Sequence, residues 1–329
     1  IRHIVNSPGG QGLDMPVSFR GRVTELRERL AADPKGTTLR GLYSTYLGAW
    51  YAVSSRVDPG SNVYERDWDA LVVLDACRVD ALEAVADEYE FLDPADIESV
   101  VSVGSSGREW LTKTFTTERR EAVAETAHVT ASRYAEPVFE DDVPGPGVPV
   151  PFGWPRRKVV DAADFAVLDR ARPRGCDDRL RSVRPSYVTE CAIDVGRSSD
   201  ADRFVAHYAQ PNAPYVGRAA REDRELTPVE ADPLTALRNG DASPEHVWEL
   251  YLDNLRLVLD HVTVLLENLD AKTVAITADH GEAIGEWGVH GHFDGLVTPA
   301  VKTVPWVETT ATDTGWRTPT IERDRELEG

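Results

Sequence analysis

Short, continuous apolar runs that end in an acidic residue constrain the fold of this chain most strongly. One occupies residues 70–74 and ends at Asp75, and another occupies residues 273–278 and ends at Asp279. Runs of this length without polar alternation are typical of strands that are buried on both faces, which occur mainly in parallel sheets covered by helices. Further strand candidates cover residues 97–103, 127–131 and 203–208, and they alternate with helical patterns over 78–88, 108–116, 185–195 and 244–268. The alternation predicts an α/β fold with a mostly parallel central sheet sandwiched by helices.

Polar residues follow or end several of these strand candidates. They are Asp75, Ser105, Ser106, His207, Asp279 and His280. In open α/β sheets, ligands bind at the carboxyl ends of the strands. We therefore expect a functional site where these residues meet.

The Asp279-His280-Gly281 sequence places a carboxylate and an imidazole at one strand end. A single Asp-His pair is more simply a helix cap beside a hydrogen-bonded histidine, but Asp75 at a second strand end favours a metal site. Mixed Asp/His ligand sets suit Zn²⁺ or Mn²⁺, and carboxylate-rich sets suit Ca²⁺ or Mg²⁺. The sequence predicts one divalent cation and leaves its identity open.

Four segments, in this order, resemble the alkaline-phosphatase/sulfatase superfamily, and its sulfatase-like branch most of all. They are Trp68-Asp-Ala-Leu-Val-Val-Leu-Asp-Ala-Cys-Arg-Val-Asp80, Pro211-Asn-Ala-Pro-Tyr215, Thr273-Val-Ala-Ile-Thr-Ala-Asp-His-Gly-Glu282 and Val304-Pro305. One such segment would be weak evidence, but the ordered set over residues 67–308 is specific. The resemblance implies that Asp75, Asp279 and His280 hold one metal.

The resemblance also implies a Ser, Thr or Cys nucleophile at the start of the helix after the second strand. Ser106 fits first and Ser105 second, although either serine is also a normal helix cap. A shift of one residue would place Gly107 there and would imply a defective enzyme. His292, in preference to His290, matches a position that contacts the substrate anion or a metal.

Three residues depart from the family pattern or have a second interpretation. Asn212 stands where the family often has His, so it can donate a hydrogen bond to substrate but cannot act as a general acid. His207 either compensates for this change or is a buried structural histidine. Arg78 either binds an anion or pairs with nearby carboxylates.

We therefore expect a hydrolase or transferase that acts on phosphate or sulfate esters through a seryl intermediate. The predicted substrates are small-molecule, glycan-linked or lipid-linked esters, and phosphate is favoured because the sulfatase pattern of Cys or Ser followed by x-Pro-x-Arg is absent. One alternative is a catalytically silent relative that keeps the metal site. Another is an unrelated α/β binding protein in which Asp-His-Gly-Glu is coincidental.

The net charge of −20 disfavours nucleic acids as partners, because an acidic surface repels their phosphates. Only five of the 36 basic residues are lysines, and scarce lysine with excess acid is typical of proteins adapted to high salt. The three cysteines match neither a zinc pattern nor a disulfide framework.

The chain divides into an N-terminal helical extension (1–66), a catalytic domain (67–310) and a polar C-terminal tail (311–329). The extension is expected to contain helices at 17–32 and 38–57. Residues 140–158 are expected to form a loop or lid, and residues 217–244 an irregular segment. Because residues 1–30 lack an apolar signal region and no apolar run is long enough for a membrane span, we expect a cytoplasmic protein. The sequence indicates no oligomeric state.

Overall fold

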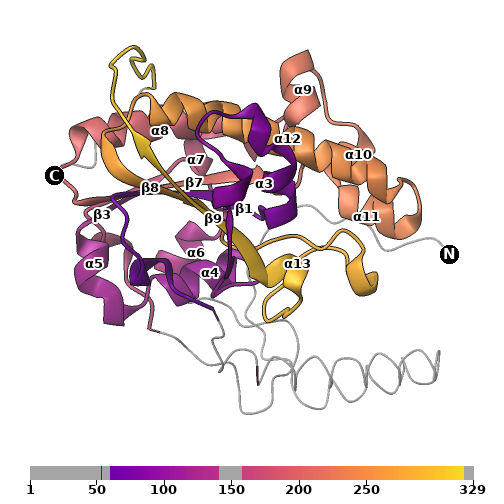
Figure 1. Cartoon of the computed structure of the whole chain (residues 1–329), viewed down its shortest axis with the longest axis horizontal. Coiled ribbons are helices and arrows are strands. Elements are labelled where there is room, and N and C mark those ends of the chain that lie inside the picture. The colour runs from indigo at the N-terminus through magenta and orange to yellow at the C-terminus, as the bar shows by residue number, and fades with distance from the viewer. Residues whose placement is uncertain (1–52, 54–59, 141–157, 322–329) are drawn as a thin grey trace, which may run out of the picture.

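The computed structural model describes residue 53 and residues 60–140 and 158–321 of the chain. Its centre is a seven-stranded sheet with the order β2-β9-β8-β1-β7-β3-β4 (Figure 1). The strands are β1 (Ala70–Asp75), β2 (Glu98–Val101), β3 (Thr126–Thr130), β4 (Val167–Arg170), β7 (Arg203–Pro211), β8 (Ala271–Thr277) and β9 (Thr303–Ala311). Five neighbours, β8 to β4, pair in parallel, and β9 pairs antiparallel with both β8 and β2. The predicted mostly parallel α/β sheet is confirmed.

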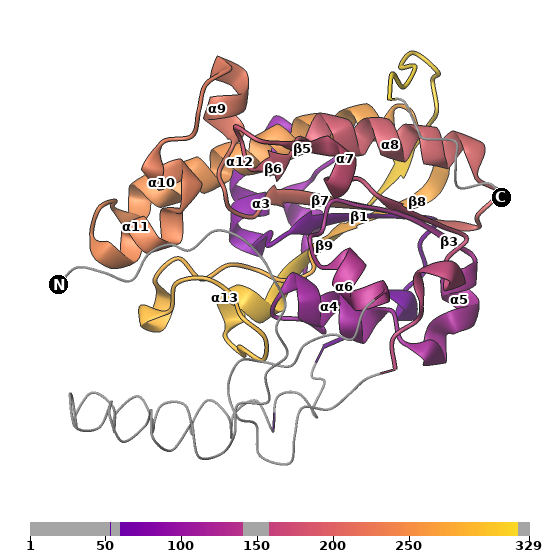
Figure 2. The same cartoon turned by 180° about the vertical axis from the view of Figure 1, so that it is seen from behind.

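Helices cover both faces of the sheet, as Figures 1 and 2 show. One face carries α3 (Val79–Val85), α8 (Pro185–Ser198) and α12 (Pro244–Leu266), and the other carries α4 (Gly107–Thr114), α5 (Arg120–Ala124) and α6 (Ala135–Phe139). The shorter helices are α7 (Arg172–Gly175), α9 (Gly217–Glu222), α10 (Pro228–Ala231), α11 (Pro233–Asn239) and α13 (Pro299–Lys302), and a small hairpin joins β5 (Cys176–Asp177) to β6 (Ser182–Val183).

The packing of strand β1 explains why polar and apolar residues do not alternate in its sequence. Val72 and Leu74 pack into the core under α8 and α12, whereas Leu71 and Val73 pack into a second core that contains Trp110 of α4. Both faces of the strand are therefore dry. Burial on both sides is what a continuous apolar run predicts.

Residues 217–244 were expected to be irregular, and that prediction is wrong. They contain α9, α10 and α11. Thr227 begins α10 in a capping box with Glu230, and Asp232 caps α11 through the amide of Thr235. These caps, each followed by proline at the first helical position, are sequence signals for helix starts.

Strand β2 differs from the other predicted strands. It is short, largely exposed and antiparallel to β9, and it lies at the edge of the sheet. The helices predicted at 17–32 and 38–57 lie outside the described residues, apart from Val53. The interior of the predicted loop at 140–158 also lies outside them. Among the described helices, none is long and apolar enough to cross a bilayer.

Candidate metal centre

Strands β1 and β8 bring Asp75, Asp279 and His280 together. The two strands are parallel neighbours, and Val73 lies opposite Thr277 in their register. The chain therefore leaves β1 and β8 at the same level and at the same edge of the sheet. One ligand atom from each of the three residues lies within 4.8 Å of the other two.

Asp279 is held by main-chain amides through one of its two oxygens. Its Oδ1 accepts hydrogen bonds from the amide of Ala76 at 3.0 Å and from the amide of His280 at 2.9 Å. Ala76 has a left-handed backbone (φ 64°), and its carbonyl accepts a hydrogen bond from the Tyr251 hydroxyl at 2.7 Å. The other carboxylate oxygen of Asp279, Oδ2, is buried and has no hydrogen-bond partner.

The hydrogen bonding of His280 identifies its tautomer. Nδ1 lies 2.8 Å from the carbonyl oxygen of Gly281 and must donate to it, so Nε2 carries a lone pair. That Nε2 lies 3.5 Å from Asp75 Oδ1 and 3.4 Å from Asp279 Oδ2. Burial, together with the charge of His292, lowers the pKa of His280 to about 3, so the ring is neutral at pH 7. The lone pair of His280 Nε2 therefore faces the two carboxyl groups.

The two carboxyl groups carry the electrostatic signature of a cation site. Burial, followed by the charge of Asp279, raises the pKa of Asp75 well above its usual range. Burial raises the pKa of Asp279 to about 7. Two buried carboxylates repel each other, and a divalent cation between them removes this cost. Two carboxylates and one neutral imidazole form a ligand set that fits Zn²⁺ or Mn²⁺.

Asn212 lies beside this cluster, where it orients a carboxylate. Its side-chain Nδ2 donates a hydrogen bond to Asp75 Oδ1 at 2.9 Å, and its backbone N–H donates to the Asp75 carbonyl oxygen at the same distance. Ligand orientation by such hydrogen bonds tunes metal sites strongly. The structure therefore places Asn212 against a predicted metal ligand.

His292 packs on His280, with 4.2 Å between the ring centroids. Its Nδ1 donates to the buried Glu282 carboxylate at 3.1 Å. Burial alone would lower the pKa of His292, but the charge and hydrogen bond of Glu282 outweigh burial and raise the pKa to about 9. His292 is therefore a cation beside the cluster at neutral pH.

The remaining substrate-binding candidates lie apart from the three ligands or have other partners. Arg78 pairs with Asp80 and Glu286 and donates to the Glu282 carbonyl, so its guanidinium is occupied by structural partners. His290 bridges to Ile284 in the loop after β8.

His207 is inside β7 rather than at its end, because β7 runs on to Pro211. Its ring is buried, stacks on His128, and has no hydrogen bond on either nitrogen. Its Nε2 lies 3.8 Å from Asp279 Oδ2.

The serines at the start of α4 have partners of their own. The Ser106 hydroxyl bonds to the Asp294 carboxylate and accepts from the amide of Glu109 at 3.1 Å, so it caps the helix. The Ser105 hydroxyl donates to Glu109 Oε2 at 2.5 Å and lies 3.0 Å from the Phe293 carbonyl oxygen. Neither hydroxyl is hydrogen-bonded to the three clustered residues, so the orientation of Ser106 toward a cation stays a prediction.

Sequence reasoning did not assign roles to several residues around the cluster. Glu282 holds His292, Asp294 holds Ser106, and Ala76 and Tyr251 fix the turn beside Asp279. The Asp-His-Gly-Glu segment itself contained the signal for Glu282. Asp294 and Tyr251 come from distant segments, and no local pattern identifies them.

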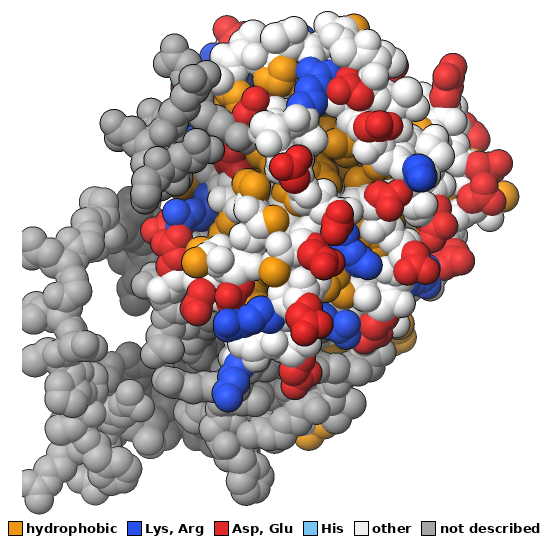
Figure 3. All heavy atoms as spheres, turned by 90° about the vertical axis from the view of Figure 1, so that its left-hand side faces the viewer, with side chains coloured by type: hydrophobic (Ala, Val, Ile, Leu, Met, Phe, Trp, Pro, Cys, Tyr) orange, Lys and Arg blue, Asp and Glu red, His pale blue; other side chains and the backbone are white. Residues whose placement is uncertain are grey.

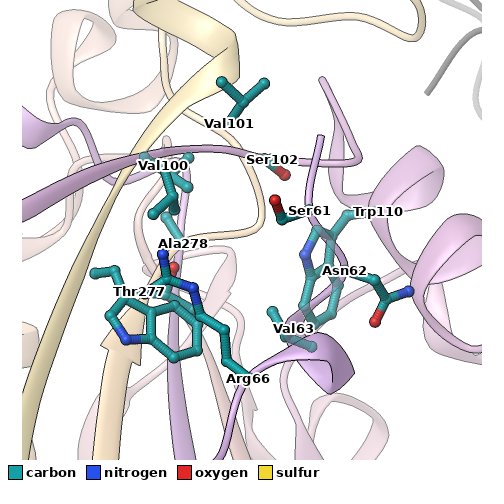
Figure 4. A pocket seen from close by; sticks show the side chains of 12 residues that line it. Ser61, Asn62, Val63, Arg66, Val100, Val101, Ser102, Trp110, Thr277 and Ala278 are labelled. Carbon is teal, nitrogen blue, oxygen red and sulfur yellow. The ribbon is translucent and has the colours of Figure 1, made fainter. Parts of the chain in front are cut away.

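A small hollow lies beside the end of β8 (Figure 4). Ser102, Trp110, Thr277 and Ala278 are among its lining residues, and Arg66 lies across it. Its volume of about 10 Å³ is at the lower limit for holding a single water molecule. It is therefore too small for an ester substrate.

No model of a known protein family matches the sequence, and no curated protein matches it. Among solved structures, the chain is similar to the soluble domain of lipooligosaccharide phosphoethanolamine transferase A from Neisseria meningitidis (16% identity, 73% of this chain and 75% of that chain, TM-score 0.49). It is also similar to the zinc complex of the C-terminal periplasmic domain of EptC from Escherichia coli (13%, 78% and 77%, TM-score 0.41). A third similar structure is a 2-O GAG sulfatase (13%, 73% and 63%, TM-score 0.41).

All three TM-scores are below 0.5. The similar structures named here are phosphoethanolamine transferases and a sulfatase.

Proposed function

We propose that this protein binds one divalent cation between Asp75, Asp279 and His280 and catalyses the hydrolysis or transfer of a phosphate or sulfate ester. One observation carries the proposal. The Oδ2 of Asp279 and the unprotonated Nε2 of His280, both buried and without a hydrogen-bond partner, converge with the Oδ1 of Asp75. Buried charges in proteins are paired or bind metals.

When bound, the cation would supply a positive charge that polarises the ester and stabilises the charge that develops on its oxygens. Hydrogen bonds from neighbouring residues orient the three proposed ligands. Asn212 fixes Asp75, the amide of Ala76 fixes Asp279, and the Gly281 carbonyl keeps the lone pair of His280 on Nε2.

His292 would hold the anionic part of the substrate. Its Nδ1 is occupied by Glu282, which leaves Nε2–H to donate to an ester oxygen. A charged donor that is already oriented costs little reorganisation when negative charge develops. This arrangement supports an anionic substrate, whether the ester belongs to a small molecule, a glycan or a lipid.

The identity of the nucleophile is a separate question. The sequence prediction is a seryl intermediate on Ser106 or Ser105, and both hydroxyls have other hydrogen-bond partners in the structure. The alternative of a silent, metal-binding relative is favoured by the same contacts. Turnover by the wild-type protein decides between an enzyme and a silent relative.

The test is hydrolysis of 4-nitrophenyl phosphate and 4-nitrophenyl sulfate in molar KCl after removal of metal and addition of Zn²⁺, Mn²⁺, Ca²⁺ or Mg²⁺. We expect turnover that depends on the added metal and is lost in Asp279→Asn. Asp223→Asn, which removes a carboxylate from an exposed ion pair with Arg179, is the matched control and should retain turnover. Equal rates in the wild type and Asp279→Asn on both esters would contradict the catalytic proposal.

A further inference from the structure

Residue 107, rather than 105 or 106, is the position at the start of α4 that faces the metal centre. A Cβ atom at Gly107 would lie 3.1 Å from Asp279 Oδ2 and 3.9 Å from the hydroxyl oxygen of Ser132. Asp279 Oδ2 is the buried oxygen without a partner. A hydroxyl side chain at position 107 would therefore point at the centre, and glycine supplies none.

The neighbouring serines cannot take this place without losing contacts that define the helix start. Ser106 is the N-cap of α4 and binds Asp294, which also pairs with Arg108. Ser105 is held by Glu109, whose second oxygen pairs with Lys113 in a buried ion pair. Both serines are thus part of a hydrogen-bond network with Glu109 and Asp294.

At this helix start, the backbone amide of Gly107 can instead donate a hydrogen bond to an external oxygen or anion. α4 starts at Gly107, whose amide has no partner within the described part of the chain, as is normal for a first helical turn. Such amides bind phosphate-like anions well. Glycine lets the chain approach Asp279 closely here, because a Cβ would already be tight against Oδ2 at 3.1 Å.

We propose, on the basis of the proposed function, that the chain forms no covalent intermediate and that water attacks the ester directly, because Gly107, the residue of this helix start that faces Asp279, supplies no hydroxyl. The water oxygen forms the new bond to phosphorus or sulfur as the bond to the ester oxygen breaks. One proton of the water ends on the released alcohol, and the other remains with the released acid or leaves to solvent. The reaction is then a one-step hydrolysis rather than transfer through a phosphoserine.

The first experiment is the stereochemistry of hydrolysis. With a 4-nitrophenyl phosphorothioate that is chiral at phosphorus through two oxygen isotopes and is hydrolysed in water labelled with the third, a single displacement by water inverts the configuration of the thiophosphate product. A seryl intermediate requires two displacements and retains it. Inversion is the expected result, and retention would overturn the proposal.

Serine variants test independently whether Ser105 or Ser106 is a nucleophile. Loss of a true nucleophile costs on the order of 10⁴-fold or more in turnover, whereas Ser105→Ala and Ser106→Ala should each stay within about tenfold of the wild type. A loss of the larger size in either variant, with zinc affinity and melting temperature unchanged, would overturn the proposal.

A third experiment needs no turnover. Gly107→Ser adds a hydroxyl beside Asp279, and Gly107→Ala adds the same Cβ without the oxygen, so the two variants are matched in steric cost. In competition with a chromophoric chelator, Gly107→Ser should bind zinc about tenfold more tightly than Gly107→Ala. Equal affinities would show that residue 107 does not face the cation and would overturn the proposal.

The outcomes separate this inference from the proposed function. A wild type that binds no zinc contradicts the metal centre itself. A wild type that binds zinc but turns over neither aryl ester overturns the water attack and leaves the silent relative.

Discussion

The strand ends at Asp75 and Asp279 and the helix start at Ser106 differ in how they are fixed. The strand ends belong to parallel neighbours, so the sheet register sets their relative position. The helix start follows the exposed edge strand β2, and its conformation is set by side-chain caps from Ser106 and Glu109. A parallel sheet thus brings distant ligands together reliably, whereas a capped turn can rotate a neighbouring residue away from the same place.

The largest expected effect comes from removing a ligand at the strand ends. His280→Ala and Asp75→Asn should each weaken zinc affinity by at least about 100-fold, because each removes a direct ligand. Zinc should raise the melting temperature of the wild type, since it binds only the folded site, and should not raise that of the variants. Thermal melts with and without zinc provide the measurement.

The matched substitution for this comparison is Ser106→Ala at the helix start. It should lower the melting temperature through the lost cap but keep the shift produced by zinc. A zinc shift that disappears in Ser106→Ala and persists in His280→Ala would reverse the roles of the two regions.

A smaller effect is expected at Asn212, which acts on a ligand without being one. Asn212→Ala leaves Asp75 Oδ1 without its side-chain hydrogen bond and should weaken zinc affinity by about tenfold. Titration against a chromophoric chelator measures the change. An unchanged affinity would show that the sheet register alone orients Asp75.

A pH prediction concerns a buried histidine that is not among the three proposed ligands. His128 in β3 is buried with both nitrogens unpartnered, and it stacks on Phe115 and His207. Burial, followed by the charge of His207, lowers the pKa of His128 well below its usual range, so the folded state keeps the ring neutral. The unfolded chain takes up a proton below about pH 6.5, and stability falls as the pH drops below that value.

With EDTA present, the free energy of unfolding should therefore fall by about 1–2 kcal/mol less in His128→Phe than in the wild type between pH 7 and pH 5. Urea titrations at the two pH values measure this difference. His246→Gln, at an exposed position, is the control and should keep the wild-type slope. The same slope in His128→Phe as in the wild type would show that His128 is not the acid-sensitive group.

The smallest expected effect concerns charge outside both regions. Acidic and basic side chains are interspersed on the described face in Figure 3, and the chain as a whole has a net charge of −20. Salt screens repulsion between exposed acids, so we expect the melting temperature to rise by roughly a few degrees between 0.1 and 2 M KCl. A flat melting temperature would contradict the predicted adaptation to high salt.

Parts of this structure follow from sequence pattern because simple rules fix them. Apolar runs predict β1 and β8, and the carboxyl ends of parallel strands bring Asp75 and Asp279 to one edge. The stripe of Val247, Tyr251 and Leu255 predicts α12. In each case a local pattern of apolar residues determines the element that forms.

Other features depended on contacts that no local pattern contains. The choice between Ser106 and Gly107 turns on one residue of helix register, which the distant Asp294 helps to set. The contact of Asn212 with Asp75 arises because β7 continues past His207 to Pro211. Such details require the packed structure.

The most direct test of the central claim is an anomalous diffraction map recorded at the zinc edge from crystals grown with zinc. The account predicts one strong peak at about 2.0–2.2 Å from Asp75 Oδ1, Asp279 Oδ2 and His280 Nε2. The absence of a peak there, or a peak only at His128 and His207, would contradict a metal centre built from the ends of β1 and β8.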